Sequence, residues 1–260
     1  MSIDGVIPVK EIDLLFKKSP CTGTDLCTKY TEQFKRRMIG RYVGEGEPFK
    51  GQLSSAILDV ASFNRDAYFE QVRSIHKGAA LRQSRKSDRA GLLADRFVWK
   101  NHIPDIVDIN TSMSSRSGGS MSKAYNRTID EMGGAPTKLK TLKEPDCYAH
   151  CIWDWGIFEE LEGYKQGEVV TNKKLVAYIR LKRQGNLGIY TTILGHGDYL
   201  KFGVMYKLHF HIMDWLAETG ESNLPSLKYI LYGAADSGNE GLRMWKKRCL
   251  FNPAYLVIKD

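Results

Sequence analysis

The sequence predicts a mixed α/β fold, of the α+β kind, in which helices flank one central sheet and an N-terminal extension precedes it. Two observations from the last third of the chain carry this prediction. Segments 175–182 and 188–194 are rich in alternating, β-branched and aromatic residues, which favour a pleated surface. Segment 204–216 repeats its large apolar residues at steps of three and four, which is typical of an amphipathic helix on a core.

The same region continues with a further strand and a short helix. Apolar residues fill segment 227–233, and segment 241–248 ends in basic residues, as helices commonly do. A glycine-rich loop from Gly195 to Gly203 separates the second strand from the amphipathic helix. A strand that leads through such a turn into a helix leaves backbone N–H groups without partners, which suits a pyrophosphate or a developing oxyanion.

The first part of the chain has a less regular pattern. We therefore expect residues 1–65 to form an N-terminal extension and residues 66–260 to form the domain itself. Within the domain, apolar spacing predicts a helix over residues 104–112. A strand is expected over residues 148–155, where the strand-rich half begins.

Composition places the chain among ordinary folded proteins. Its 260 residues are 42% hydrophobic and 26% charged, which is enough to bury a core. No apolar run approaches the ~18 residues of a membrane span, and the first residues do not resemble a signal peptide. We expect a cytoplasmic protein without membrane contact, and the five cysteines, an odd number, are expected to be reduced. The oligomeric state has no signature in the sequence.

The chain is basic, with a formal net charge of +8 at pH 7. Its lysines and arginines are clustered, and the clusters are residues 35–37, 82–89, 138–143 and 246–248. Such clusters form a positive surface that attracts phosphates, or alternatively a solvated face with no anionic partner.

Cysteine and histidine occur together in the segment Cys147-Tyr-Ala-His150-Cys151. Cys21 and Cys27 would supply two further soft ligands for a zinc site. If residues 148–155 form a strand, as expected, His150 and Cys151 point to opposite faces of the sheet. Buried cysteines are then the simpler explanation, and we expect no metal.

Short motifs in both halves of residues 66–260 resemble GNAT-like domains of the Fem aminoacyltransferase kind. In the first half these are Leu81-Arg-Gln-Ser-Arg-Lys-Ser-Asp-Arg-Ala-Gly91, Pro104-Asp-Ile-Val-Asp-Ile109, Arg116-Ser-Gly-Gly-Ser-Met121 and Tyr125. In the second half they are Lys228-Tyr-Ile-Leu-Tyr-Gly233, Gly241-Leu-Arg-Met-Trp-Lys246 and Phe251-Asn-Pro253, which resemble a closing strand, a helix and a final strand.

This resemblance implies transfer of an acyl group from a thioester or an aminoacyl ester to a nucleophile, usually an amine. The implied donors are acetyl-CoA or another acyl-CoA, with aminoacyl-tRNA as the alternative. Such an enzyme mainly aligns its substrates, polarises the carbonyl with a backbone N–H and removes a proton from the amine. Residues implied at the donor are Leu194, Gly195, Gly197, Lys201, Gly203 and Lys246.

The sequence departs from the usual acetyltransferase pattern at two points. Its glycine loop, Gly195-His-Gly-Asp-Tyr-Leu-Lys-Phe-Gly203, is longer than the usual one, which puts CoA binding in question. The aromatic hydroxyl that often protonates the leaving thiolate is absent, because Trp245 and Lys246 occupy that stretch. Lys246 would meet the leaving group or a phosphate instead, or it lies on a solvated helix face.

Four residues are candidates for proton transfer. His196 and Asp198 lie in the glycine loop, where a base reaches an acceptor amine, although both types are also common in surface turns. Tyr232 and Asp236 lie at the end of the strand at 227–233, where ligands gather in such folds; alternatively Tyr232 packs and Asp236 caps the next helix. The resemblance alone places two further residues at the acceptor, Arg116 and Tyr125.

Two functions from different classes follow. The first is acyl transfer to an amine on a small molecule, a peptide or a nucleic-acid base, as in enzymes that decorate phage DNA. The second is non-catalytic nucleic-acid binding through the basic clusters and stacking aromatics. The aromatics proposed for stacking are Tyr42, Trp99, Tyr125 and Tyr148.

Overall fold

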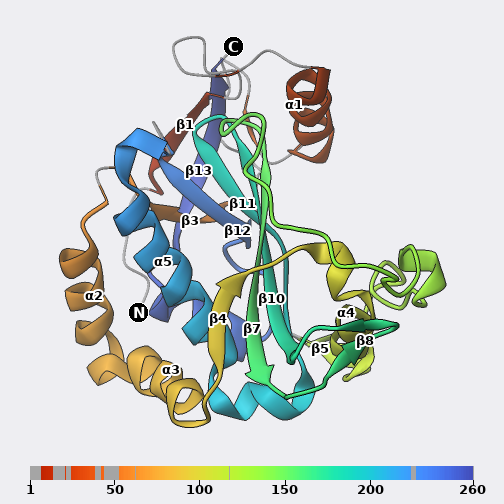
Figure 1. Ribbon diagram of the computed structural model, residues 1–260. Helices are drawn as coiled ribbons and strands as arrows, with labels where there is room; N and C mark the ends of the chain where they lie inside the picture. The colour runs from red at the N-terminus through yellow and green to blue at the C-terminus, as the bar shows by residue number, and fades with distance from the viewer. Residues whose placement is uncertain are drawn as a thin grey trace.

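One mixed sheet forms the centre of the protein (Figure 1). The computed structural model describes residues 7–13, 21, 25–38, 42–43, 53–61, 63–116, 118–223 and 227–259. The strands of this sheet are β1 (Val9–Asp13), β2 (Tyr42–Val43), β3 (Ser55–Asp59), β4 (Leu93–Arg96), β7 (Ile152–Glu160), β10 (Lys173–Gln184), β11 (Leu187–Gly195), β12 (Tyr229–Ala234) and β13 (Asn252–Lys259). Their order is β1-β13-β3-β12-β11-β10-β7-β4, with β2 also paired to β13.

Helices cover both faces of this sheet, which confirms the predicted fold class (Figure 1). They are α1 (Asp25–Met38), α2 (Arg65–Ser74), α3 (Ala79–Arg89), α4 (Ile103–Thr111), α5 (Val204–Asn223) and α6 (Glu240–Arg248). Helices α2, α3, α5 and α6 share one apolar cluster with the sheet, whereas α1 and α4 pack in separate clusters on the other face. Short elements between them are η1 (Ile75–Gly78), η2 (Trp99–Asn101), η3 (Asp130–Met132), η4 (Gly197–Phe202), and the hairpins β5 (Ser115–Arg116) with β6 (Gly119–Ser120) and β8 (Lys165–Gln166) with β9 (Val169–Val170).

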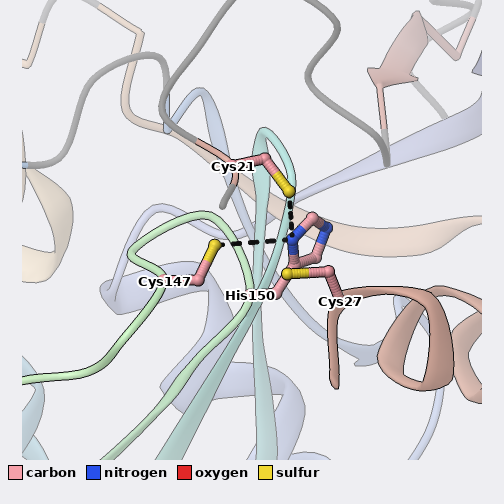
Figure 2. A group of neighbouring side chains, drawn as sticks. All are labelled: Cys21, Cys27, Cys147 and His150. Carbon is pink, nitrogen blue, oxygen red and sulfur yellow. Dashed lines mark hydrogen bonds between the residues drawn. The ribbon is translucent and has the colours of Figure 1, made fainter. Parts of the chain in front are cut away.

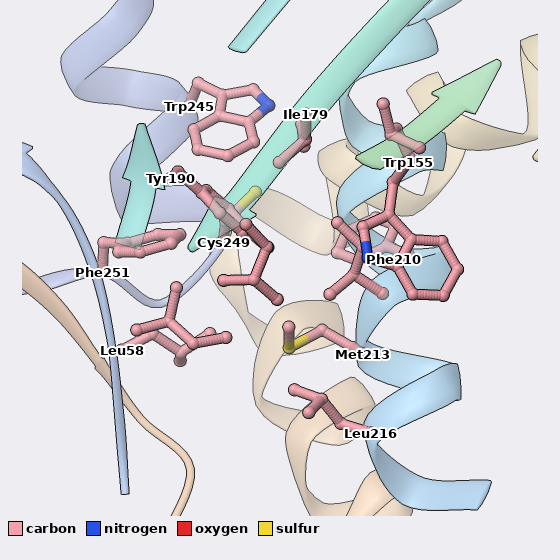
Figure 3. Close-up of a cluster of buried hydrophobic side chains, with 14 of the residues drawn as sticks. Leu58, Trp155, Ile179, Tyr190, Phe210, Met213, Leu216, Trp245, Cys249 and Phe251 are labelled. Carbon is pink, nitrogen blue, oxygen red and sulfur yellow. The ribbon is translucent and has the colours of Figure 1, made fainter. Parts of the chain in front are cut away.

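The largest apolar cluster lies between the sheet and α5. Ile179 of β10 and Trp155 of β7 meet Phe210 and Met213 of α5 in this layer (Figure 3). The neighbouring Tyr178 points to the opposite face and packs with α4, because side chains alternate along a strand. The alternation seen in the sequence of β10 therefore divides its side chains between two helical layers.

The described strands within residues 1–65 belong to the central sheet, contrary to our expectation of a separate extension. Strand β1 pairs in parallel with β13, and β3 lies between β12 and β13, antiparallel to both. The sequence does not predict β1, because this five-residue edge strand has mostly polar side chains. The boundary predicted at residue 65 separates strands of one sheet rather than two units.

Two local expectations also differ from the structure. Strand β7 begins at Ile152, so residues 147–150 form a turn in which the His150 amide donates to the Cys147 carbonyl at 3.3 Å. The loop after β11 contains the 3₁₀ helix η4. Backbone groups of Gly197–Phe202 are therefore part of a helix, and do not form an open glycine-rich loop around a ligand.

Candidate active site

Strands β11 and β12 run in parallel but pair only over their first residues. Their register joins Leu187, Gly188 and Ile189 to Tyr229, Ile230 and Leu231, and no described strand pairs that edge of β11 further on. A β-bulge explains the parting. Against β10, Arg180 pairs with Thr192 and Leu181 pairs with Tyr190, so Thr191 is an additional residue in β11. Such a residue bends its strand and increases the local twist.

The opposite strand bends at the same level. The pairing of β12 with β3 is irregular between Leu231 and Ala234, and Gly233 has a φ of 65°. A positive φ is readily adopted only by glycine, which explains this residue type at the bend. The two strands thus diverge, and alternate N–H groups of β11 beyond Thr191 face the space between them rather than a neighbouring strand.

A cavity of about 380 Å³ occupies the space between the diverging strands. Its wall is mainly apolar, with three polar side chains. The lining residues are Met113, Arg116, Ile193, Leu194, Gly195, Leu200, Met205, Tyr232, Asn239, Gly241, Leu242 and Trp245. An apolar pocket with a few convergent polar groups is the usual form of a small-ligand site.

Burial changes the pKa of two polar side chains in this cavity, Arg116 and Tyr232. The Arg116 guanidinium donates to the Gly195 carbonyl at 2.7 Å and to the Ile109 carbonyl at 2.9 Å, and burial lowers its pKa. Burial also raises the pKa of Tyr232, helped by the nearby Tyr125. Because a raised pKa keeps the Tyr232 hydroxyl protonated at neutral pH, this group is a hydrogen-bond donor and not a base.

Helix α6 presents its first turn to the cavity. Asn239 is the N-cap, since its side chain accepts from the Leu242 amide at 3.0 Å. The alternative in which Asp236 caps this helix is therefore wrong, and Asp236 is exposed outside the cavity. The early amides of a helix have no partner within it, so this end of the cavity favours a negative or carbonyl oxygen.

The structure brings four predicted site residues together at the cavity: Arg116, Leu194, Gly195 and Tyr232. The proposed bases His196 and Asp198 do not line it. Instead, His196 Nδ1 accepts from the Asp198 amide at 3.3 Å, and His196 Nε2 is 3.5 Å from Asp108. Tyr125 packs beside α4 in the apolar cluster that contains Tyr178.

The other residues expected at the donor, apart from Leu194 and Gly195, have internal roles or lie outside the cavity. Gly203 abuts the Gln83 backbone of α3, and the Gly197 amide donates to Ser112 Oγ at 3.0 Å. Lys201 is exposed on η4, with its ammonium 5.1 Å from the Phe202 ring centroid. Lys246 is only 3% exposed, so the solvated helix face considered for it is wrong.

Most of the apolar residues that line the cavity were not predicted from the sequence. Met113, Leu200, Met205 and Leu242 look like ordinary core residues, because a cavity between two helices and a split sheet has no sequence period of its own. One signal was present: Thr191 and Thr192 interrupt the alternation of β11 at the bulge.

A second group of reactive side chains lies away from this cavity. Cys21, Cys27, Cys147 and His150 place their ligand atoms within 4.8 Å of one another (Figure 2). The strand expected over residues 148–155 begins only at Ile152, and residues 147–150 form a turn that brings Cys147 and His150 together. Cys151 instead packs in the main apolar cluster.

No protein-family model and no curated protein matches this sequence. Among solved structures, the chain is similar to the crystal structure of FemX, with a TM-score of 0.49, 11% identity, and coverage of 86% of this chain and 66% of that one. It is also similar to L-PGS from Bacillus licheniformis, with a TM-score of 0.43, 15% identity, and coverage of 77% and 57%.

A C-terminal domain (DUF2156) from Agrobacterium fabrum is similar with a TM-score of 0.39 and 16% identity, covering 78% of this chain and 58% of that one. The present chain thus spans between 57% and 66% of the length of these three structures. Among the described residues, no helix has the length and apolar character needed to cross a bilayer.

Proposed function

We propose that this chain is a GNAT-type acyltransferase that moves an acyl group from an activated ester to an amine. The donor is an acyl-CoA or an aminoacyl ester such as aminoacyl-tRNA. The observation that carries the proposal is the parting of β11 and β12, which exposes main-chain amides of β11 at a cavity of about 380 Å³. An activated ester needs alignment and a polarised carbonyl more than covalent help, and this arrangement offers both.

The roles of the lining residues follow from their chemistry. Main-chain amides of β11 beyond the bulge polarise the acyl carbonyl, while the apolar wall holds the acyl chain. The Tyr232 hydroxyl stays protonated and donates to the carbonyl or to the leaving group. Arg116 fixes the end of β11 through its bond to the Gly195 carbonyl.

The surroundings of the cavity favour an ester carried by RNA over a CoA thioester. The packing of Gly203 against Gln83 and the helix η4 fill the place where a pyrophosphate cradle was expected. Helix α3 contacts both η4 and α6, which line the cavity, and its outer face carries the exposed Arg82, Arg85 and Arg89. A basic face beside the site attracts a polyanionic donor. The amine acceptor, including a nucleic-acid base, belongs to the same proposal.

Non-catalytic nucleic-acid binding is not favoured by any contact of the described aromatics. The Arg180 guanidinium lies 3.8 Å from the centroid of Trp99, and Tyr178 packs against the same ring at 5.2 Å. Tyr148 donates to Glu144 at 3.0 Å. These rings make internal contacts, which leaves less of their faces for stacking bases.

The substitution Gly241→Leu tests the cavity. Gly241 lines the cavity, and a Cβ there would meet only Asn239 Oδ1, at 3.5 Å, so a leucine can be added to this wall without a backbone clash. Leucine is also the better helix former by ~1 kcal/mol. We expect full thermal stability but at least a tenfold loss of donor affinity, measured by thermal shift and filter binding with acetyl-CoA, other acyl-CoA species and aminoacyl-tRNA.

Glu240→Leu is the matched control, because Glu240 is the neighbouring helical residue and does not line the cavity. This control should retain both donor affinity and transfer of a labelled acyl group to added amines. Equal donor affinity in Gly241→Leu and wild type would remove the cavity from the donor site. A wild-type protein that transfers no acyl group from any of these donors would end the proposed function.

A further inference from the structure

The second side-chain group joins two segments that are far apart in the sequence. Cys21 precedes α1, and Cys27 lies in the first turn of that helix. Cys147 and His150 come from the turn before β7. Figure 2 shows the three sulfur atoms gathered around the ring of His150.

The distances within the group are those of a tetrahedral metal centre. His150 Nδ1 lies 3.4 Å from Cys21 Sγ and 3.8 Å from Cys147 Sγ, and all four ligand atoms lie within 4.8 Å of one another. With Zn–S bonds of ~2.3 Å and a Zn–N bond of ~2.0 Å, a tetrahedron separates S and N by ~3.5 Å and two sulfurs by ~3.8 Å. From this agreement we propose that Cys21, Cys27, Cys147 and His150 bind a structural Zn²⁺.

Local structure aims these side chains at one point. The turn at residues 147–150 is closed by the His150 amide on the Cys147 carbonyl, which places the two side chains on the same side. Cys27 is the third residue of α1, where the helix dipole and early amides stabilise a thiolate. Cys27, Cys147 and His150 are buried and Cys21 is partly exposed. Four ligands with little solvent access are typical of structural rather than catalytic zinc.

The charge balance also fits zinc. Three thiolates, one neutral imidazole and Zn²⁺ sum to one negative charge. The Arg183 side chain is 1% exposed, and burial lowers its pKa to about 10. The nearby sulfurs of Cys151 and Cys147 act in the opposite direction and favour the charged guanidinium. A buried cation beside this centre compensates its negative charge.

Cys151 is close in sequence but is not one of the ligands. Its thiol donates to the Tyr148 carbonyl at 3.3 Å, and burial raises its pKa. Cys151→Ser is therefore a matched control: it makes the same chemical change one residue away from His150, and the serine can keep the hydrogen bond.

The bound ion would fasten α1 to the rest of the protein. This helix buries Cys27, Thr31 and Phe34 on one face, and Phe34 reaches the apolar cluster of β13 and β3. A tetrahedral centre cross-links the start of α1 to the turn before β7 and adds its binding free energy to folding.

Elemental analysis of untagged protein, purified without chelator, tests the site. We expect about one zinc ion per chain in the wild type and in Cys151→Ser, and at least a tenfold lower content in Cys147→Ser and His150→Ala. Removal of the metal should accelerate amide exchange in α1 first and lower the melting temperature. Absence of zinc from wild-type protein, with none regained from added ZnSO₄ under reducing conditions, would overturn the proposal.

A second measurement applies if the ligand variants do not fold. Wild-type protein loaded with Co²⁺ should show the intense visible absorption of a tetrahedral thiolate site, and zinc X-ray absorption should give three sulfur ligands and one nitrogen. A disulfide among Cys21, Cys27 and Cys147 in freshly prepared protein would contradict the site, as would equal zinc loss in Cys151→Ser and Cys147→Ser.

Discussion

At the scale of single residues, Lys246 and His209 are buried polar side chains that bind internal partners. The Lys246 ammonium donates to the Ala234 carbonyl at 2.6 Å, the Ser237 carbonyl at 3.1 Å and Ser237 Oγ at 3.0 Å. These bonds close the turn between β12 and α6 and thereby hold one wall of the cavity. Lys246 was expected near a phosphate because it lies in a basic run. A buried ammonium without hydrogen-bond partners would destabilise the protein, so its donors are used inside the fold.

His209 is a second buried polar residue with an internal role. Its Nε2 is 2.8 Å from the Tyr68 hydroxyl and its Nδ1 is 2.9 Å from the Tyr190 hydroxyl. Burial lowers the pKa of His209 to about 3, from an ordinary histidine value of 6.5. The folded protein therefore keeps this ring neutral at pH values where the unfolded chain protonates it.

A pH dependence of stability follows from His209. Since the unfolded state binds the additional proton, the free energy of unfolding is greatest above the ordinary histidine pKa and falls as the pH drops. Between about pH 6 and pH 4, the wild type should lose up to ~1.4 kcal/mol per pH unit more than His209→Gln does. Urea titrations at several pH values measure both slopes.

Equal slopes in the two proteins would contradict this assignment. If His209→Gln does not fold, NMR of the wild type provides the test, because the His209 ring should keep the chemical shifts of its neutral form down to about pH 4.

At the scale of elements, the bulge at Thr191 ends the pairing of β11 with β12 and opens the space that the cavity occupies. Without it, β11 would continue beside β12 and their amides would be used in the sheet. Helix α3 does not line the cavity but contacts η4 and α6, which do. Its small buried residues, Ala80, Ser84 and Ser87, let it pack closely against α5, and Ser87 donates to the Phe202 carbonyl at 2.7 Å.

Gly203→Ala tests whether this glycine serves helix packing rather than a donor. Gly203 has a φ of 73°, and a Cβ there would collide with the Gln83 carbonyl oxygen of α3. We expect a loss of more than ~2 kcal/mol in unfolding free energy, measured by urea denaturation, because strain and overpacking add. Gly91→Ala is the control, since Gly91 has a φ of 70° but no atom within 4 Å of the added Cβ. This control should lose only ~1 kcal/mol. Equal stability of the two variants, with donor affinity lost only in Gly203→Ala, would return Gly203 to the donor site.

At the scale of the whole molecule, the sheet combines strands from the two ends of the chain. Strand β3 is hydrogen-bonded to both β12 and β13, and β1 is hydrogen-bonded to β13 along its length. Ile12 and Ile57 from these strands pack with Leu231 and Leu256. Strands β1 and β3 therefore belong to the same sheet as the strands of the later residues.

A chain of residues 66–260 should not fold. Removal of β3 leaves β12 and β13 without their shared partner. It also removes four buried residues of β3 and exposes the apolar residues that packed against them. We expect an insoluble or unfolded product, whereas a chain that starts at residue 7 should remain folded. Solubility and amide NMR dispersion distinguish the two. A well-dispersed spectrum from residues 66–260 would show that the N-terminal residues are an extension after all.

Strands β10, β11 and β12, helices α5 and α6, and their order were predictable from the sequence alone, because side-chain period and turn residues are local properties. The GNAT-like resemblance also comes from the sequence, and four of the site residues predicted with it line the cavity: Leu194, Gly195, Arg116 and Tyr232. Other features appear only in the folded protein. The insertion of β3 into the sheet and the parting of β11 from β12 depend on pairing between distant segments. The meeting of Cys21 and Cys27 with Cys147 and His150 is likewise a contact across more than a hundred residues, which no local pattern encodes.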